Sequence, residues 1–297
     1  MKQKLDNFFK KPFWPSFLAT LIFGVLLVGL IFLNKPASDS EVFNQAIENQ
    51  LSSENIYRSR TIEEGKSSQK QVTVVNFSNK DNPISHDLVE INNQSQGQDV
   101  QVVTEGIGTP KADYIRYIKL DGTGSKSASS IIGKWAKNDS TATQPAQFLD
   151  NAIFGSPLMT GPLSNSTRSF IMNEIKNNKA ITIKTVDTNA TVDGKKVYKY
   201  IVDLNLKNYI PLYKKYLTEL GLSKTASKLT APQTDSNLQM VIYIDPVTKK
   251  IIKAESPQDA EGGGEYYVNE KFIIPPAVPS KIGVSVEELQ KALSPSQ

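Results

Sequence analysis

The most constraining feature of this sequence is a single apolar run without any charge, Phe17–Leu33. As an α-helix, this run would span about 26 Å, because each helical residue rises about 1.5 Å. Phe13 and Trp14 lengthen it to roughly the ~30 Å thickness of a bilayer's hydrocarbon core. The sequence therefore predicts one transmembrane helix over Phe13–Leu33, which makes the membrane a partner of the chain.

The charges before the run predict its orientation. Four lysines precede it, against the single acidic residue Asp6, and they are Lys2, Lys4, Lys10 and Lys11. Lysine and arginine next to a membrane span remain on the cytoplasmic side. We therefore expect a single-pass protein of the cell membrane, with its N-terminus in the cytoplasm and its C-terminal part extracytoplasmic.

The residues after the run indicate that the anchor is kept. A cleaved signal peptide needs small residues in an A-x-A-like pattern, but Lys35 stands two positions before Ala37. The apolar run is also longer than the roughly 7–15 residues of a signal-peptide core. An uncleaved signal anchor is favoured, and a cleaved signal peptide is the alternative.

Composition excludes several classes of protein. The chain has 34 basic and 30 acidic residues, but residues 1–35 hold five lysines and one aspartate, so the remainder carries 29 of each sign. A neutral remainder argues against nucleic acid as a partner, because nucleic-acid binding needs a basic face. The chain has no cysteine and a single histidine, His86, so no disulfide, thiolate nucleophile or histidine-cluster metal site is available. No cofactor is expected.

The remaining residues alternate between strand and helix patterns. Helical spacing of apolar residues predicts a helix of about 14 residues from Glu41, capped by Ser40. Further helices are expected at Pro145–Phe154, Thr167–Asn177, Tyr209–Leu220, with Pro211 in its first turn, and from Ser285 to Leu293. Period-two patterns between turn residues predict strands at Tyr57–Glu64, Gln71–Phe77, Asp87–Ile91, Gln98–Glu105, Ala112–Leu120, Gly133–Lys137, Ala180–Asp187, Lys196–Leu206, Asn237–Asp245, Lys250–Glu255 and Glu265–Phe272.

Runs of consecutive strands favour antiparallel pairing and an α+β fold class. We divide the chain into a basic cytoplasmic N-terminus (1–12), the anchor (13–33), a linker (34–40), an extracytoplasmic α+β domain (41–274) and a Pro-rich tail with a short helix (275–297). The linker spans at most about 25 Å when fully extended, so the domain would remain close to the membrane.

No motif for catalysis stands out. His86 lies between Ser85 and Asp87, which suggests a triad, but sequence neighbours rarely form one, and a histidine in a surface loop is the simpler interpretation. The Gly-rich segment Asp121–Ser127 lacks the spacing of a phosphate-binding loop and reads as a hairpin loop. We therefore expect no catalytic residue and no enzyme activity.

One apolar segment between Gly and Pro breaks is a candidate for ligand binding. Such a segment either covers a core or lines an apolar cavity with movable walls. Core packing is the simpler interpretation, and ligand lining is the functional one. The candidate ligand-lining residues are Phe148, Ile153, Phe154, Leu158, Met159, Leu163 and Met172.

The order of these elements, with Lys134-Trp135 after a strand and the hairpin over Met240–Lys253, resembles the bacterial lipoprotein-carrier fold (LolA/LppX/LprG-like) over about residues 41–273. The resemblance implies a large curved antiparallel sheet, a half-barrel, with helices on its concave face over acyl chains. It implies non-catalytic binding of a lipid or other apolar ligand. The chain departs from this family because a protein helix replaces the lipid attached to cysteine, which puts free shuttling in doubt.

Two other functions remain open at this point. One is a structural or protein-interaction domain of the cell envelope that binds no small ligand. The other is an envelope hydrolase, although the sequence identifies neither a nucleophile nor a metal motif for it.

Overall fold

The computed structural model describes residues 38–79, 82–95, 98–122, 128–141, 146–156, 158–256, 264–267 and 277–293. The chain divides into two compact units, Met1–Glu41 and Val42–Gln297, and the fold below is that of the second unit. The expected anchor, Phe13–Leu33, lies outside the described residues. Within the described ranges, no helix is both long enough and apolar enough to cross a membrane.

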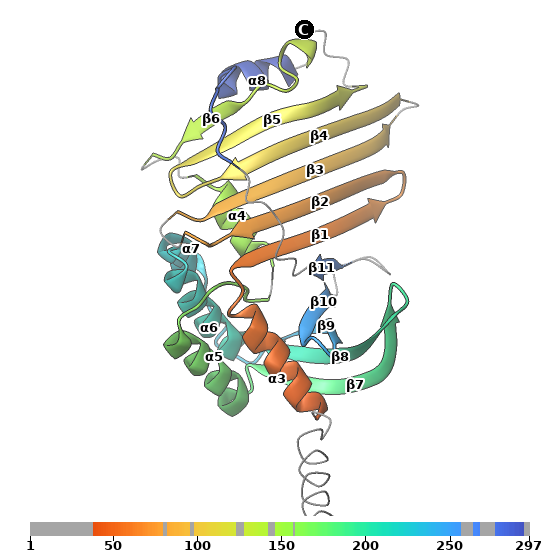
Figure 1. The fold of residues 1–297 in the computed structure, drawn as a ribbon, viewed down its shortest axis with the longest axis vertical. Coiled ribbons are helices and arrows are strands. Elements are labelled where there is room, and N and C mark those ends of the chain that lie inside the picture. The colour runs from red at the N-terminus through yellow and green to blue at the C-terminus, as the bar shows by residue number, and fades with distance from the viewer. Residues whose placement is uncertain are drawn as a thin grey trace, which may run out of the picture. The chain divides into compact units, whose positions relative to one another are not determined.

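Eleven strands form one open antiparallel sheet in the order β6-β5-β4-β3-β2-β1-β11-β10-β9-β8-β7 (Figure 1). With the helices described below, this sheet confirms the predicted α+β class. The strands are β1 (Asn55–Glu64), β2 (Ser67–Asn76), β3 (Ile84–Ser95), β4 (Gln98–Gly108), β5 (Ala112–Asp121), β6 (Ala136–Asp139), β7 (Ile181–Val192), β8 (Lys195–Asn205), β9 (Asn237–Asp245), β10 (Lys250–Glu255) and β11 (Glu265–Tyr267).

The sheet consists of two runs of sequential strands that meet at a short seam. Strands β1 to β6 pair one after another, and so do β7 to β11. The two runs join where β1 pairs with the three residues of β11, in the register Arg58↔Tyr267, Ser59↔Tyr266 and Arg60↔Glu265. Only a few backbone pairs hold this seam, so side chains that cross it matter for the cohesion of the sheet.

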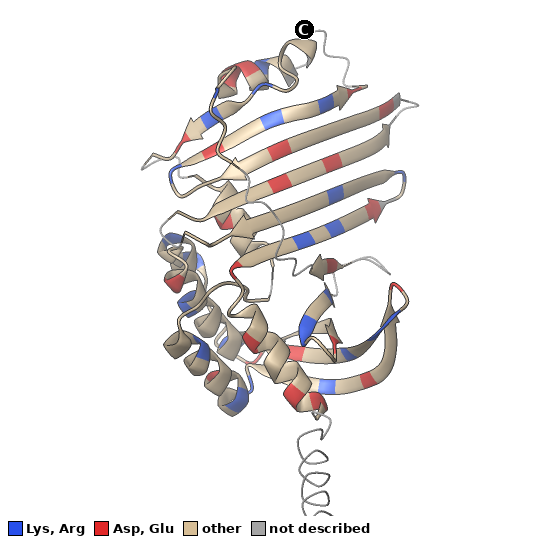
Figure 2. Cartoon of the chain, in the orientation of Figure 1, with Lys and Arg blue, Asp and Glu red and all other residues tan. Residues whose placement is uncertain are grey.

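Helices lie before, between and after the two runs of strands, and helices also interrupt the second run between β8 and β9. They are α3 (Asp39–Gln50), α4 (Phe148–Phe154), α5 (Asn165–Asn178), α6 (Leu206–Glu219), α7 (Ser223–Lys228) and α8 (Val286–Leu293), with a short 3-10 turn at Ala128–Ser130. Charged residues of both signs occur on the strands and on the helices (Figure 2).

Turn chemistry explains the hairpins that were predicted. Asp193 and Gly194 both have positive φ, 49° and 74°, which a two-residue type I′ turn between β7 and β8 requires. In the β9–β10 turn, the Asp245 carboxylate accepts hydrogen bonds from the backbone N–H groups of Val247 and Thr248, at 2.8 and 3.1 Å. The observed bounds of β9 and β10 are those predicted from the sequence.

Two helices begin earlier in the sequence than predicted. Helix α6 begins at Leu206, because the Asn205 side chain caps it by accepting from Asn208 N–H, so Pro211 lies in the helix interior and not in its first turn. Helix α3 begins at Asp39, with Ser38 Oγ accepting from Glu41 N–H, so Ser40 is not its cap.

Strand β6 begins later than expected. Gly133 has a φ of 75° and donates its N–H to Tyr117 O, so it belongs to a turn and the strand starts at Ala136. Helix α7, Ser223–Lys228, was not predicted at all, because its six residues are too few to show a helical period.

The predicted apolar stripe of α6 packs into the core. Tyr216 and Leu217 are fully buried, as are Ile242 and Ile244 on β9. Phe43 of α3 packs against Tyr200 of β8, with 5.2 Å between ring centroids. Burial of these large side chains supplies the main stabilising term for this part of the chain.

The C-terminal helix α8 docks on the outer end of the sheet. Leu289 and Ala292 of α8 are buried against Leu120, Ile131 and Ala136. The predicted capping box is present, because Ser285 Oγ accepts from Glu288 N–H at 3.1 Å and Glu288 Oε2 accepts from Ser285 N–H at 2.7 Å.

Candidate functional site

Strand register divides the side chains of β1–β5 between two faces. Arg58, Thr73, Asp87, Gly106 and Ile115 are successive cross-strand partners and therefore share one face. Helix α4 lies against β2, β3 and β4. It covers part of the face that carries these residues, and we call that face the α4 face. The opposite face, which carries His86, we call the histidine face.

Two glycines of β4 allow α4 to lie close to the sheet. A Cβ at Gly108 would come within 2.3 Å of Leu149 N, and one at Gly106 within 3.1 Å of the Phe148 ring. The Asp113 carboxylate accepts hydrogen bonds from the backbone N–H groups of Gln147 and Phe148, at 2.8 and 3.0 Å. The first residue of α4 is therefore fixed on the sheet by β4 and β5 together.

Two cavities adjoin at the Phe148 ring. The smaller, of about 200 Å³, is lined by Val89, Gly106, Ile115, Phe148 and Ala152, and its polar lining comes from Gln71, Asp87, Thr104 and Asn151. The larger, of about 650 Å³, lies between the start of α4 and the start of α8, and it also includes Ile115 and Phe148. Phe148 is thus a wall common to both.

The larger cavity has a mixed lining. Val286 of α8 adds to the apolar surface of Ile115 and Phe148. The polar lining is contributed by Asp113, Lys137, Asn138, Gln147, Ser285, Glu287 and Gln290. A ligand in this space would therefore meet apolar groups as well as hydrogen-bond donors and acceptors.

An apolar row continues across the α4 face beyond the cavities. It consists of successive cross-strand partners on β1–β5, of which Ile62, Ile91, Val102 and Leu120 are apolar, and the polar Gln69 lies between Ile62 and Ile91. Leu120 is buried under α8, whereas Ile62 and Ile91 are each 39% exposed. The row therefore runs from the α8 contact to open apolar surface.

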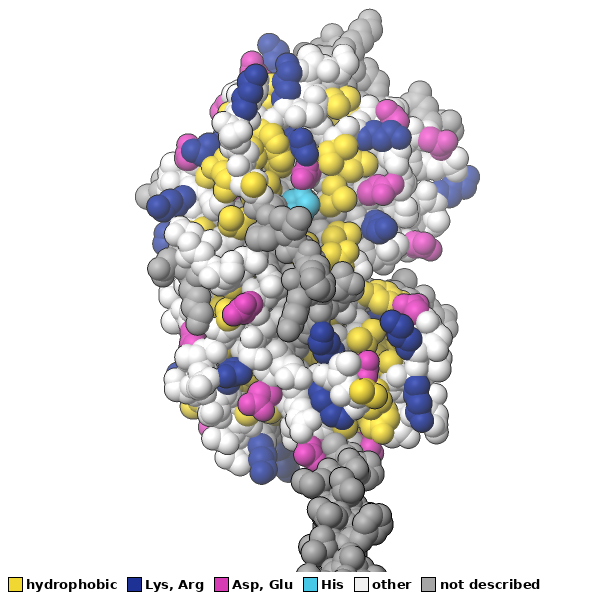
Figure 3. Space-filling view, in the orientation of Figure 1, with side chains coloured by type: hydrophobic (Ala, Val, Ile, Leu, Met, Phe, Trp, Pro, Cys, Tyr) yellow, Lys and Arg dark blue, Asp and Glu magenta, His cyan; other side chains and the backbone are white. Residues whose placement is uncertain are grey.

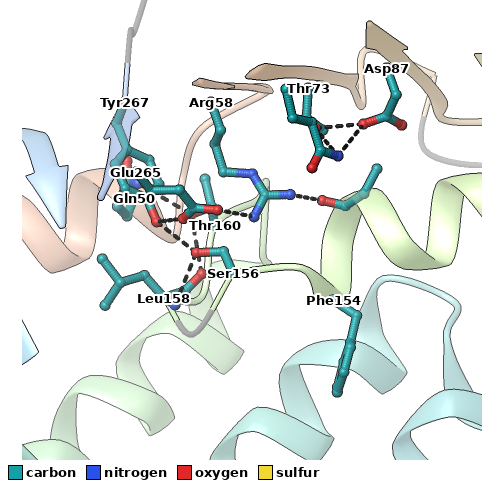
Figure 4. A network of polar contacts seen from close by, with 12 residues as sticks. Gln50, Arg58, Thr73, Asp87, Phe154, Ser156, Leu158, Thr160, Glu265 and Tyr267 are labelled. Carbon is teal, nitrogen blue, oxygen red and sulfur yellow. Dashed lines mark hydrogen bonds and ion pairs between the residues drawn. The ribbon is translucent and has the colours of Figure 1, made fainter. Parts of the chain in front are cut away.

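A buried polar network underlies α4 (Figure 4). Arg58 Nη1 lies 3.2 Å from Glu265 Oε1, and Arg58 Nη2 donates to the carbonyl oxygen of Ala152 in α4. Asp87 Oδ1 accepts from Thr73 Oγ1 at 2.5 Å and from Gln71 Nε2 at 3.3 Å. Burial raises the pKa of Asp87 and that of Asp113 above the ordinary aspartate value.

The segment after α4 is held to α6 by tyrosines. Tyr213 Oη donates to Ser156 O and Tyr216 Oη donates to Thr160 O, each at 2.8 Å. Ser156 Oγ lies 2.6 Å from Tyr267 Oη. Burial raises the pKa of Tyr216 to about 12, so it remains a neutral hydrogen-bond donor. These contacts fix Ser156 and Thr160 as part of the core.

The predicted ligand-lining residues lie in different environments. Phe148 lines both cavities. Phe154, at the end of α4, is 41% exposed and packs edge-on against Tyr213, and Met172 of α5 is half-buried. The others are at most 5% exposed and lie in the core: Ile153, Leu158, Met159 and Leu163. Ligand contact by these seven residues stays a prediction.

Sequence reasoning missed most of the residues around the cavities. Val89, Thr104 and Ile115 were taken as ordinary strand positions, Asp87 was considered only as a triad neighbour of His86, and Asp113 was given no role. The available signal was Gly106 and Gly108, because glycine inside a strand often marks a close approach of another backbone.

His86 does not lie in a loop, contrary to the simpler interpretation of the sequence. It belongs to β3, and its Nε2 lies 2.8 Å from Glu105 Oε1, while Arg116 Nε donates to Glu105 Oε2 at 2.5 Å. Ser85 and Asp87 point to the opposite face, because adjacent strand residues alternate, so these three neighbours form no triad.

Hydrophobic side chains gather around the histidine on the histidine face (Figure 3). The Arg116 guanidinium lies over the Trp135 ring, 4.6 Å from its centroid. Among the described residues, no group of three or more His, Asp or Glu side chains could hold a metal ion.

Comparison with known proteins gives little further information. No protein-family description matches the sequence, and neither does any curated protein. Among solved structures, the chain is similar to the crystal structure of LprF from Mycobacterium bovis, with 11% sequence identity and a TM-score of 0.39, covering 84% of this chain and 99% of that chain. A structural likeness at this TM-score is too weak to show a shared family, so membership of the lipoprotein-carrier family stays a prediction.

Proposed function

We propose that the chain is a membrane-anchored extracytoplasmic protein that binds a lipid or another ligand with an apolar part on the α4 face, between α4 and α8. The observation that carries this proposal is the pair of adjoining cavities at Phe148, which continue into the apolar row that ends at Ile91 and Ile62. The finer architecture, a half-barrel whose concave side holds the ligand, belongs to the same proposal.

The size and lining of the cavities support this assignment. The larger cavity, at about 650 Å³, is within the roughly 300–1,000 Å³ of small-molecule sites. Val89, Ile115 and Phe148 offer apolar contact, whereas Asn138, the cross-strand partner of Asp113 on the same face, offers an amide donor to a polar head group. A lining that combines apolar and hydrogen-bonding groups suits an amphipathic molecule better than a sugar or an ion.

The anchor is the second part of the proposal and rests on the Phe13–Leu33 run and the lysines before it. In cells, we expect the full chain in the membrane fraction after a carbonate wash. A C-terminal tag should be digested by protease added outside spheroplasts. Release of the chain by carbonate, or protection of the tag, would contradict this part alone.

Photolabelling tests the binding site in the full-length protein. Membranes that contain the chain are incubated with a diazirine-bearing palmitate analogue, irradiated, and the labelled peptides are mapped. We expect labelling of peptides that contain Val89, Thr104, Ile115 or Phe148. A Thr104→Trp variant should reduce the labelling at least fivefold, because the indole would occupy the smaller cavity.

Val103→Trp is the matched control for this experiment. Val103 is the neighbour of Thr104 on β4, and its side chain points to the histidine face, so its replacement adds the same bulk without filling the cavity. Labelling that is equal in the wild type and in both variants, or that is spread evenly along the chain, would exclude the α4 face as the binding site.

A further inference from the structure

The Phe148 side chain stands where the two cavities adjoin, because it lines both of them. It stands over Gly106, whose added Cβ would lie 3.1 Å from both Cδ2 and Cε2 of the ring. Ile115 is the direct cross-strand partner of Gly106 and lines both cavities together with Phe148. The ring and these two residues therefore form a partition across the α4 face.

Hydrogen bonds to the backbone at the start of α4 fix the position of Phe148. Asp113 accepts the N–H of Phe148 at 3.0 Å and that of Gln147 at 2.8 Å. The lack of a side chain at Gly108 allows α4 to approach the sheet. The position of the Phe148 Cα is thus fixed, and only side-chain rotation or truncation changes how far the two cavities communicate.

We propose that Phe148 sets the length of the apolar chain that the α4 face accepts. This inference rests on the proposed function. A polar head in the larger cavity would lie near Asn138, and an attached chain that points toward Val89 meets the Phe148 ring first. With the ring in place, additional methylenes stay in water; without it, they enter the smaller cavity.

The expected effect follows from the burial of methylenes. Burying one CH₂ contributes about 0.8 kcal/mol, which corresponds to about a fourfold change in affinity. In Phe148→Ala, chains longer than the wild-type optimum should therefore gain about fourfold per additional buried methylene. Phe148→Trp should shift the optimum toward shorter chains.

Competition by saturated fatty acids, from octanoate to stearate, against the diazirine palmitate measures this preference in membranes that contain the full chain. Partition of each acid into the bilayer is the same for every variant, so the ratio of variant to wild type isolates the protein. Phe170→Ala is the matched control, because it truncates a phenylalanine of α5 that is 42% exposed and is not among the lining residues of either cavity.

The outcomes separate the two proposals. A shift to longer chains in Phe148→Ala, with wild-type preference in Phe170→Ala, supports the partition. Wild-type preference in Phe148→Ala and Phe148→Trp, with labelling intact, overturns the role of Phe148 and leaves the proposed function standing. If no fatty acid competes and no cavity peptide is labelled in the wild type, the proposed function fails first. Should Phe148→Ala not fold, Phe148→Trp decides the question.

Discussion

Arg58 on β1 and Glu265 on β11 form an ion pair across the seam of the sheet, with 3.2 Å between Nη1 and Oε1 and side-chain exposures of only 5% and 14%. The same guanidinium donates to the Ala152 carbonyl of α4, and Glu265 accepts from Tyr267 Oη at 2.5 Å. One buried cation therefore connects the two runs of strands with the helix that borders the cavities.

Breaking this pair should be strongly destabilising. Arg58→Met leaves the Glu265 carboxylate buried without its cation, which typically costs about 3–5 kcal/mol of unfolding free energy. The double variant Arg58→Met/Glu265→Leu removes both charges and should recover most of that loss. Urea denaturation of the detergent-solubilised chain measures both values, and Lys70→Met, at an exposed position of the neighbouring strand β2, should change stability by less than about 0.5 kcal/mol. Equal losses in the single and double variants would contradict this account.

The Asp113 carboxylate acts as a cap for α4 supplied by another element. Asp113→Ala removes the acceptor of two backbone N–H groups, so we expect a loss of about 1–2 kcal/mol, the range for a lost helix cap. Amide hydrogen exchange in α4 should also be faster in the variant than in the wild type, whereas exchange in α6 should change less. Asp121→Asn, on the same strand, is the control, because Asp121 forms an exposed ion pair with Lys119 at 3.0 Å, of a kind that contributes little to stability. Unchanged exchange in α4 would rule out the capping role.

The elements that could be predicted from the sequence are those whose signals are local. The Asp193-Gly194 turn, the β9–β10 hairpin and the Ser285–Glu288 capping box are each specified within a few residues, and the structure has all three. The start of α6 was misplaced because Asn205 ends β8 and caps the helix at once, leaving no turn residue between them.

The candidate site could not be predicted in the same way, because it depends on partners far apart in the sequence. Gly106 matters only because Phe148 stands over it, and Asp113 only because it meets the N–H groups of residues 147 and 148. The apolar segment that includes Leu158 and Met159 carried a strong hydrophobic signal, yet these two side chains are core. Hydrophobicity alone does not distinguish a cavity wall from a core.

Proline at position 211 weakens α6. The helix starts at Leu206, so residue 211 lies where an N–H would donate to the Lys207 carbonyl, and proline has none. Pro211→Ala should therefore raise the unfolding free energy by about 1 kcal/mol, because a helical hydrogen bond is added at an exposed position. Thermal unfolding measures the change, and Lys207→Ala in the first turn should leave it within about 0.5 kcal/mol. A loss of stability in Pro211→Ala would mean that proline fits this site better than alanine does.

Asp87 makes stability depend on pH in a direction opposite to that of most carboxylates. Burial raises its pKa in the folded chain above the ordinary value of 3.8. Between these two pKa values the folded state holds a proton that the unfolded state has lost, so this group's contribution to stability falls as pH rises through that window. Asparagine keeps the acceptor for Thr73 and Gln71 but does not ionise. The stability of Asp87→Asn relative to the wild type should therefore increase as pH rises from below 3.8 through the folded pKa.

Urea denaturation at a series of pH values measures this difference, with the exposed Asp235→Asn as the control for the substitution itself. A difference that stays constant, or that decreases with pH, would show that the folded pKa of Asp87 is not raised.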